Sequence, residues 1–231
     1  MASSNKKSEK EISEKKPQKG LTKPDKELYW VLGVMLVLIV VFIISFSFFR
    51  ESNSFEYNGL KFTKTLFGDL PLYRYTYLTS VTVRTITGEV IRTTDSKNVI
   101  LLIRVDPRKN KVPVTGKIEY FAKEKSVYVS INSTGLLCPY SQVALAELGS
   151  FLSQNDLIIE TGSADETDAK ENNLTYISCD NYPDNMVILL QSGEESSVAR
   201  ENNCYIITVA DCDVIPPVEK FIVQSIIDSK D

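Results

Sequence analysis

The sequence predicts an α+β fold with an N-terminal transmembrane helix, an antiparallel β meander and then an α/β layer. Three observations predict it. An uncharged apolar run fills residues 28–49, segments of alternating apolar and polar residues occupy 55–131, and helical and extended patterns alternate over 132–229. Because strands that alternate with helices pack as an α/β layer, we expect the last region to form a sheet covered by helices.

Residues 1–27 are predicted to form a disordered, lysine-rich cytoplasmic tail. The segment consists mainly of Lys, Glu and Ser, with prolines and a glycine, so it has little apolar surface to bury. Its lysines outnumber Arg50, Lys61 and Lys64, the cations on the other flank of the apolar run. The positive-inside rule therefore places the N-terminus in the cytoplasm and residues 50–231 outside it.

The apolar run over residues 28–49 is predicted to cross the bilayer once. At about 1.5 Å per residue, a helix of this length spans roughly 33 Å, against about 30 Å of hydrocarbon. Tyr29 and Trp30 suit the cytoplasmic interface, and Arg50 closes the outer end.

A cleaved signal peptide is the alternative reading of this run. Such a peptide has an apolar region of about 7–15 residues and a small-residue cleavage site. The present run is longer, and Phe46, Phe48 and Phe49 occupy the expected site. We therefore expect a retained signal-anchor in the cell membrane, with the lipid bilayer as the partner of residues 28–49.

Strands are predicted throughout the β-rich region 55–131. Tyr73, Tyr75 and Tyr77 alternate with polar residues, the period of a half-buried strand. The alternation continues through Val81, Val83 and Thr85 to a turn at 87–89. The further predicted strands are 90–94, 99–105, 117–122 and 127–131.

The region 132–229 is predicted to alternate helices and strands. Residues 141–152 have helical periodicity, residues 164–172 form an acidic helix capped by Ser163, and Pro216 or Pro217 opens a final helix. The predicted strands are 157–160, 175–178, 186–191 and 205–210.

The chain lacks histidine, and this absence excludes several classes of enzyme. Histidine is the usual general base near neutral pH and the commonest metal ligand. Ser-His-Asp catalysis, Cys-His catalysis and H-E-x-x-H zinc peptidases are therefore excluded. Any chemistry must use carboxylates, Lys, Tyr or Cys, and we expect neither a cofactor nor a metal ion.

All four cysteines, Cys138, Cys179, Cys204 and Cys212, follow the apolar run. An even number on the oxidising side of a membrane predicts two disulfides, with buried free thiols as the alternative. Cys204 and Cys212 flank a predicted strand, and eight steps of about 3.3 Å separate them by roughly 26 Å. A disulfide requires less than about 7 Å, so each should pair with Cys138 or Cys179.

One cysteine begins a motif with a chemical meaning. Cys138-Pro139-Tyr140-Ser141 follows the predicted strand 127–131 and opens a helix, the position at which a helix N-terminus activates a thiol. This motif resembles the active-site turn of glutaredoxins and of the wider thioredoxin fold, with Ser141 in place of the second cysteine and Pro183 shortly before a later strand. The resemblance covers the chain from Val127 onward. It implies a thioredoxin-like arrangement and a monothiol oxidoreductase that uses Cys138.

At the scale of the whole chain, four short segments resemble uncharacterised archaeal single-pass membrane-anchored proteins. The segments are Tyr57-Asn58-Gly59-Leu60, Asp106-Pro107-Arg108-Lys109-Asn110, Cys138-Pro139-Tyr140 and Asn202-Asn203-Cys204-Tyr205. No activity is known for that group, so the resemblance implies the membrane topology and adds no function.

Two glycosylation sequons begin at Asn132 and Asn173, both beyond the apolar run. The region after that run is acidic, which argues against a nucleic-acid partner. We expect a membrane-anchored extracytoplasmic module that binds or assembles with a protein partner at the cell surface and is not an enzyme. The alternative is the oxidoreductase that uses Cys138.

Overall fold

The computed structural model describes residues 23–51, 53–84, 90–119, 126–132, 136 and 138–230. It confirms a mixed α+β fold: one N-terminal apolar helix, an antiparallel four-stranded sheet, then a mixed sheet with helices. The chain divides into two compact units, Met1–Glu51 and Ser52–Asp231. The predicted tail up to residue 22 and the predicted turn at 87–89 lie outside the described residues.

The first unit contains helix α1 (Lys23–Glu51). Its stretch Lys26–Phe46 is long and apolar enough to cross a membrane, and none of that stretch is buried by protein. The helix begins before the predicted boundary at residue 28, so the last residues of the predicted tail are helical. Pro24 in the first turn explains this early start, because its ring presets the helical φ angle and a first-turn N–H needs no partner. Helix α1 is a candidate membrane anchor.

The second unit begins with an antiparallel sheet, here called the meander sheet. Its strands are β1 (Ser54–Tyr57), β2 (Leu60–Phe67), β3 (Leu70–Arg84) and β4 (Val90–Ile103), in that order. Asn58 and Gly59 both have positive φ, as the tight β1–β2 turn requires. The prediction missed β1 and β2, and it divided β4 into residues 90–94 and 99–105. The alternating pattern predicted from Tyr73 onward agrees with β3, which runs through a register shift between Ser80 and Thr82.

The remaining strands form a second sheet, here called the mixed sheet. They are β5 (Val114–Thr115), β6 (Ser126–Ile131), β7 (Ile158–Ser163), β8 (Met186–Ser192), β9 (Ser197–Glu201) and β10 (Cys204–Val209), in the order β5-β9-β10-β8-β6-β7. Strands β10, β8, β6 and β7 are parallel, whereas β9 runs antiparallel to β10.

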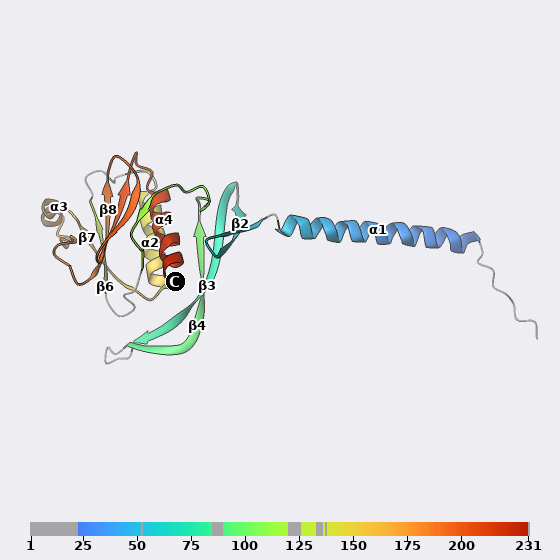
Figure 1. The fold of residues 1–231 in the computed structure, drawn as a ribbon, viewed down its shortest axis with the longest axis horizontal. Coiled ribbons are helices and arrows are strands. Elements are labelled where there is room, and N and C mark those ends of the chain that lie inside the picture. The colour runs from blue at the N-terminus through green and yellow to red at the C-terminus, as the bar shows by residue number, and fades with distance from the viewer. Residues whose placement is uncertain are drawn as a thin grey trace, which may run out of the picture. The chain divides into compact units, whose positions relative to one another are not determined.

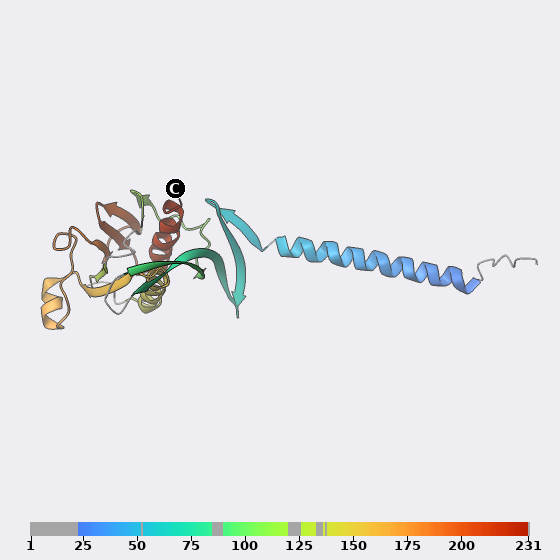
Figure 2. The same cartoon turned by 90° about the horizontal axis from the view of Figure 1, so that it is seen from below.

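Two long helices lie between the two sheets. Helix α2 (Ser141–Gln154) joins β6 to β7, and helix α4 (Ile215–Asp228) follows β10. Figures 1 and 2 show both helices between the mixed sheet and strands β3 and β4. The short helix α3 (Glu166–Glu171) lies between β7 and β8 in the chain.

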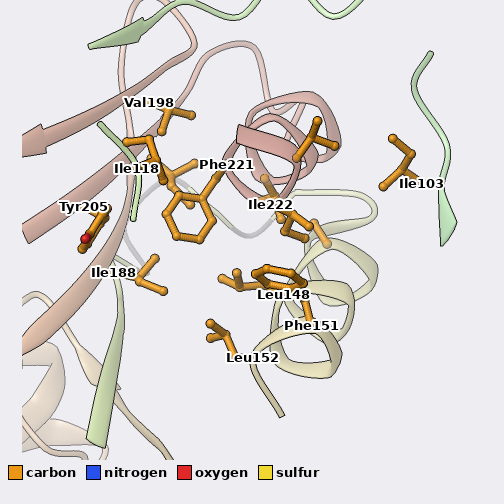
Figure 3. Packing of buried hydrophobic residues seen from close by; sticks show 14 of the residues in the cluster. Ile103, Ile118, Leu148, Phe151, Leu152, Ile188, Val198, Tyr205, Phe221 and Ile222 are labelled. Carbon is orange, nitrogen blue, oxygen red and sulfur yellow. The ribbon is translucent and has the colours of Figure 1, made fainter. Parts of the chain in front are cut away.

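One hydrophobic core joins the helices to both sheets. The fully buried ring of Phe221 points from α4 toward Ile188 and Tyr205 of the mixed sheet, and Ile103 approaches the helices from the meander sheet (Figure 3). The rings of Phe221 and Tyr205 meet edge to face, with centroids 5.9 Å apart. The helical layer therefore supplies both sheets with their apolar partner.

Three local predictions were wrong. Of the predicted strand 117–122, residues 117–119 form no strand, because the N–H of Ile118 donates to the Asp228 carboxylate at 2.6 Å instead of to a neighbouring strand; residues 120–122 lie outside the described residues. Over 175–178 only Tyr176 forms a bridge, to Ser163. Helix α3 is capped by Asp165, whose carboxylate accepts the N–H groups of residues 167 and 168; the hydroxyl of Ser163 instead donates to Asp168.

Candidate functional site

The candidate site lies where the parallel strands of the mixed sheet end. The chain leaves β6 through α2 to reach β7 on one side, and it later returns to β8 on the other side of β6. Ligands of open α/β sheets bind at such a switch point, beyond the carboxyl ends of the strands. The segments that follow β6 and β10 meet at this edge.

A disulfide joins these two segments. Cys138 lies between β6 and α2, and Cys212 lies between β10 and α4; their sulfurs are bonded, with Cα atoms 5.3 Å apart. The bond ties together the beginnings of both long helices. Cys179 bonds to Cys204, so the predicted exclusion of a Cys204–Cys212 pair is confirmed.

The backbone beside this disulfide adopts conformations that its residues disfavour. Tyr140 has φ 67° and Cys212 has φ 58°, both in the left-handed region. The other non-glycine residues with positive φ in the described chain are Asn or Asp, which tolerate that region. A left-handed conformation costs roughly 1–2 kcal/mol for an ordinary residue. Such strain is concentrated at functional sites. Because it occurs beside both cysteines of one disulfide, we take this edge of the sheet as the candidate functional site.

Hydrogen bonds hold Tyr140 in its strained conformation. The buried hydroxyl of Ser141 donates to the Leu136 carbonyl at 2.8 Å, and the Ser141 N–H donates to the Cys138 carbonyl at 3.2 Å. The Tyr140 carbonyl accepts the N–H groups of Val143 and Ala144, both at 3.0 Å. The Tyr140 ring is left 66% exposed. Ser141, which stands where the glutaredoxin motif has a second cysteine, therefore has a structural role here.

The exposed Tyr140 ring borders an open groove of about 590 Å³. The residues that line the groove carry no charge: Ile131, Leu136, Cys138, Tyr140, Ser141, Gln142, Val143 and Leu145. Apolar walls with a few polar groups are typical of a site for an uncharged or peptide-like ligand. The amide of Gln142 and the hydroxyl of Tyr140 supply polar groups here.

Two carboxyl groups lie in the helical layer. The Glu219 carboxylate accepts the backbone N–H groups of Arg104 and Val105 at 2.6 and 2.8 Å, which fastens α4 to the end of β4. Burial raises the pKa of Glu219 to about 7. Burial, and next the nearby Glu219, raise the pKa of Glu147 to about 8, and one of its carboxylate oxygens has no hydrogen-bond partner among the described residues.

Sequence reasoning missed both carboxyl groups, although one signal was present. Glu219 stands three residues before Ile222, on the apolar face of its helix, where a charged residue is unexpected. Such a residue can be predicted to be a buried carboxyl only when the element that covers this face of the helix is known. Here that element is the meander sheet, which the sequence alone does not place against α4.

Other predicted residues lie elsewhere. Pro183 lines a separate pocket beside the Cys179–Cys204 disulfide, and no peptide bond in the described chain is cis. Asn132 is half-buried directly after β6, where its N–H donates to the Leu190 carbonyl. Asn173 is exposed after α3. Glycosylation at these two sequons stays a prediction.

Comparison with family models, with curated proteins and with solved structures found no match to this chain. Within the described ranges, no group of three or more Cys, Asp or Glu side chains could hold a metal ion. The site is therefore interpreted from its own geometry.

Proposed function

We propose that this chain is a single-pass membrane protein whose extracytoplasmic domain binds a protein partner at the cell surface through the groove beside the Cys138–Cys212 disulfide. One observation carries the proposal. Tyr140 and Cys212 are, in the described chain, the left-handed residues that are not Gly, Asn or Asp, and both lie beside the same groove at the switch point of the sheet. Because hydrogen bonds fix the backbone around Tyr140, little backbone entropy is lost when this residue binds a partner.

Three features support the location outside the cytoplasm. Helix α1 is long and apolar enough to serve as the anchor. Both disulfides lie beyond that helix, and disulfides persist in oxidising compartments. The lysines that precede the apolar run favour a cytoplasmic N-terminus.

The groove has the composition of the centre of a protein interface. Charged residues are depleted from the cores of interfaces, whereas tyrosine is enriched there and carries much of the binding energy. The groove has an exposed Tyr140 and no charged lining residue. We therefore expect Tyr140 to insert between apolar side chains of the partner.

Photocrosslinking in intact cells tests the proposal. A benzoylphenylalanine placed at position 140 of the full chain should give one discrete adduct, and the adduct should disappear when Val143→Glu puts a charge into the groove. Leu78, which is 67% exposed on the meander sheet, is the matched control position. Equal adducts from positions 140 and 78, or an adduct that survives Val143→Glu, would contradict the proposal.

The oxidoreductase that uses Cys138 is the second candidate, favoured by the position of Cys138 at the beginning of α2. Alkylation of the native protein separates the two functions. The binding module is expected to keep all four cysteines oxidised and unlabelled. Rapid, pH-sensitive labelling of Cys138 under mildly reducing conditions would favour the oxidoreductase instead.

A further inference from the structure

The β2–β3 hairpin extends beyond the rest of the meander sheet. The first residue of β1, Ser54, pairs with Thr63, and the last residue of β4, Ile103, pairs with Tyr73. Beyond these pairs, β2 and β3 continue as a two-stranded ribbon that ends at the pair Phe67 and Leu70. Four further residues at about 3.3 Å each carry β2 roughly 13 Å past Thr63.

The end of this ribbon is apolar and uncovered. Leu66 is 70% exposed, Phe67 77% and Leu70 41%, and none of them belongs to the hydrophobic core. The connecting turn contains Gly68, at φ 61°, and Asp69. Residues 66–70 are called the ribbon tip below. Leu66 and Phe67 point to opposite faces, so the tip is apolar on both sides and lacks the polar face expected in water.

A short connection joins the end of the candidate anchor to the meander sheet. Only residues 52 and 53 separate the end of α1 at Glu51 from Ser54. Three Cα steps of at most about 3.8 Å limit that connection to about 11 Å. The ribbon projects from the same end of the meander sheet at which this connection enters, because β2 runs antiparallel to β1 and passes beyond its first residue. The lengths of this connection and of the ribbon therefore limit the distance between the tip and the end of α1 to roughly 30 Å.

We infer that the ribbon tip inserts its apolar side chains into the lipid interface next to the anchor, as a second and shallower membrane contact. This inference rests on the proposed membrane anchorage. A membrane anchor that ends three residues before β1 brings lipid close to this sheet. Lipid also accepts apolar side chains on both faces of the ribbon. Lys64 and Arg74 are exposed three to four residues further back along the same strands, where cations can meet anionic headgroups.

Tryptophan fluorescence with brominated lipids tests this inference on the full chain. The native chain has one tryptophan, Trp30, within α1. In a Trp30→Phe background, Phe67→Trp places the only indole at the tip. Leu174→Trp, in the same background, places it at a 51% exposed position between α3 and β8 as the control. The three proteins are reconstituted into vesicles of phosphatidylcholine and phosphatidylglycerol with bromine either near the headgroup or deep in the acyl chains.

The tip indole is expected to lose most of its emission to the shallow bromine and less to the deep one, whereas the control at position 174 loses none. An unquenched tip indole beside a quenched native Trp30 would overturn the inference and leave the anchor standing. If Trp30 also stays unquenched, the proposed anchorage itself fails. A blue-shifted but unquenched tip indole would show that protein, such as a second copy, covers the tip, and this too would overturn the inference.

Discussion

The two sheets of the domain share a pair of helices but are held in different ways. The mixed sheet carries both disulfides, and a second small cluster around Ile177 and Val187 packs outside the main core. The meander sheet has no disulfide within its strands, and Leu78, Ile100 and Leu102 are exposed on its outer face. One sheet is cross-linked, whereas the other depends on its contact with the helices.

The strand sequences reflect this difference. Strand β8 reads MVILLQS and is buried almost throughout its first five residues, as is typical of a parallel strand covered on both faces. Strand β2 reads LKFTKTLF, and only Leu60 and Phe62 are buried. The stability of the meander sheet therefore comes from one face, and this sheet should respond to perturbation separately from the mixed sheet.

Removal of the disulfides is expected to have the largest effect. Cys138 and Cys212 are 74 residues apart and Cys179 and Cys204 are 25 apart. By loop-closure entropy, replacement of each pair by serine should lower the free energy of unfolding by about 4.5 and about 3.5 kcal/mol. Chemical denaturation of the two double variants measures this order, and a larger loss for the shorter loop would contradict it.

The meander sheet can be weakened on its own. Phe62 is fully buried and stacks near Phe55 and Tyr75, so Phe62→Ala should cost about 3–5 kcal/mol. Native-state hydrogen exchange should show this loss in the amides of β2 and β3 and much less in those of β8 and β10. Leu78→Ala, on the exposed face, is the control and should change stability by less than about 0.5 kcal/mol. Equal losses in both sheets would remove the distinction between them.

The helical layer should make the domain less stable as the pH rises. The pKa of Glu147 is raised to about 8 by burial, so the folded state holds a proton that the unfolded state releases. Stability is therefore full below about pH 4.5, falls as the pH rises toward about 8 and then levels off, with a limiting slope of about 1.4 kcal/mol per pH unit for each such carboxyl.

A neutral replacement isolates this contribution. Glu147→Gln keeps the shape of the side chain and should flatten the loss of stability between acidic and mildly alkaline pH, as measured by denaturation across that range. Glu171→Gln, on the exposed helix α3, is the charge-matched control and should leave the slope as it is. An unchanged slope in Glu147→Gln would show that the carboxyl is not buried as described.

The smallest expected change in stability comes from substitution of Tyr140, whose backbone is strained and whose side chain is exposed. Glycine tolerates the φ of 67° found at Tyr140, and relief of that strain opposes the greater flexibility of glycine in the unfolded chain. Tyr140→Gly should therefore change the free energy of unfolding by less than about 1 kcal/mol, while it abolishes binding at the groove. A large loss of stability would make Tyr140 a structural residue.

Much of the fold could be predicted where one segment carries its own signal. The helix over 141–152, the proline-opened final helix and the separation of Cys204 from Cys212 follow from local periodicity and chain geometry. The predicted strand 205–210 agrees with β10, because a continuous apolar run suits a buried strand.

Other features depend on contacts between distant segments. Strand β9 reads SVARE, which has no apolar run or alternation that would predict a strand. It forms a strand by pairing with β10 and β5. Asn58-Gly59 is a residue pair typical of hairpin turns, but β1 is too short to give a period of its own, so this hairpin was missed. The groove forms only where the segments after β6 and β10 meet. No pattern within either segment predicts that they meet.

Protease treatment of intact cells tests the central claim, a domain held outside by one membrane anchor. With an epitope at each end of the chain, protease should remove the C-terminal epitope or cut soon after Glu51, while the N-terminal epitope survives until the membrane is permeabilised. Loss of the N-terminal epitope from intact cells, with the C-terminal domain protected, would contradict it.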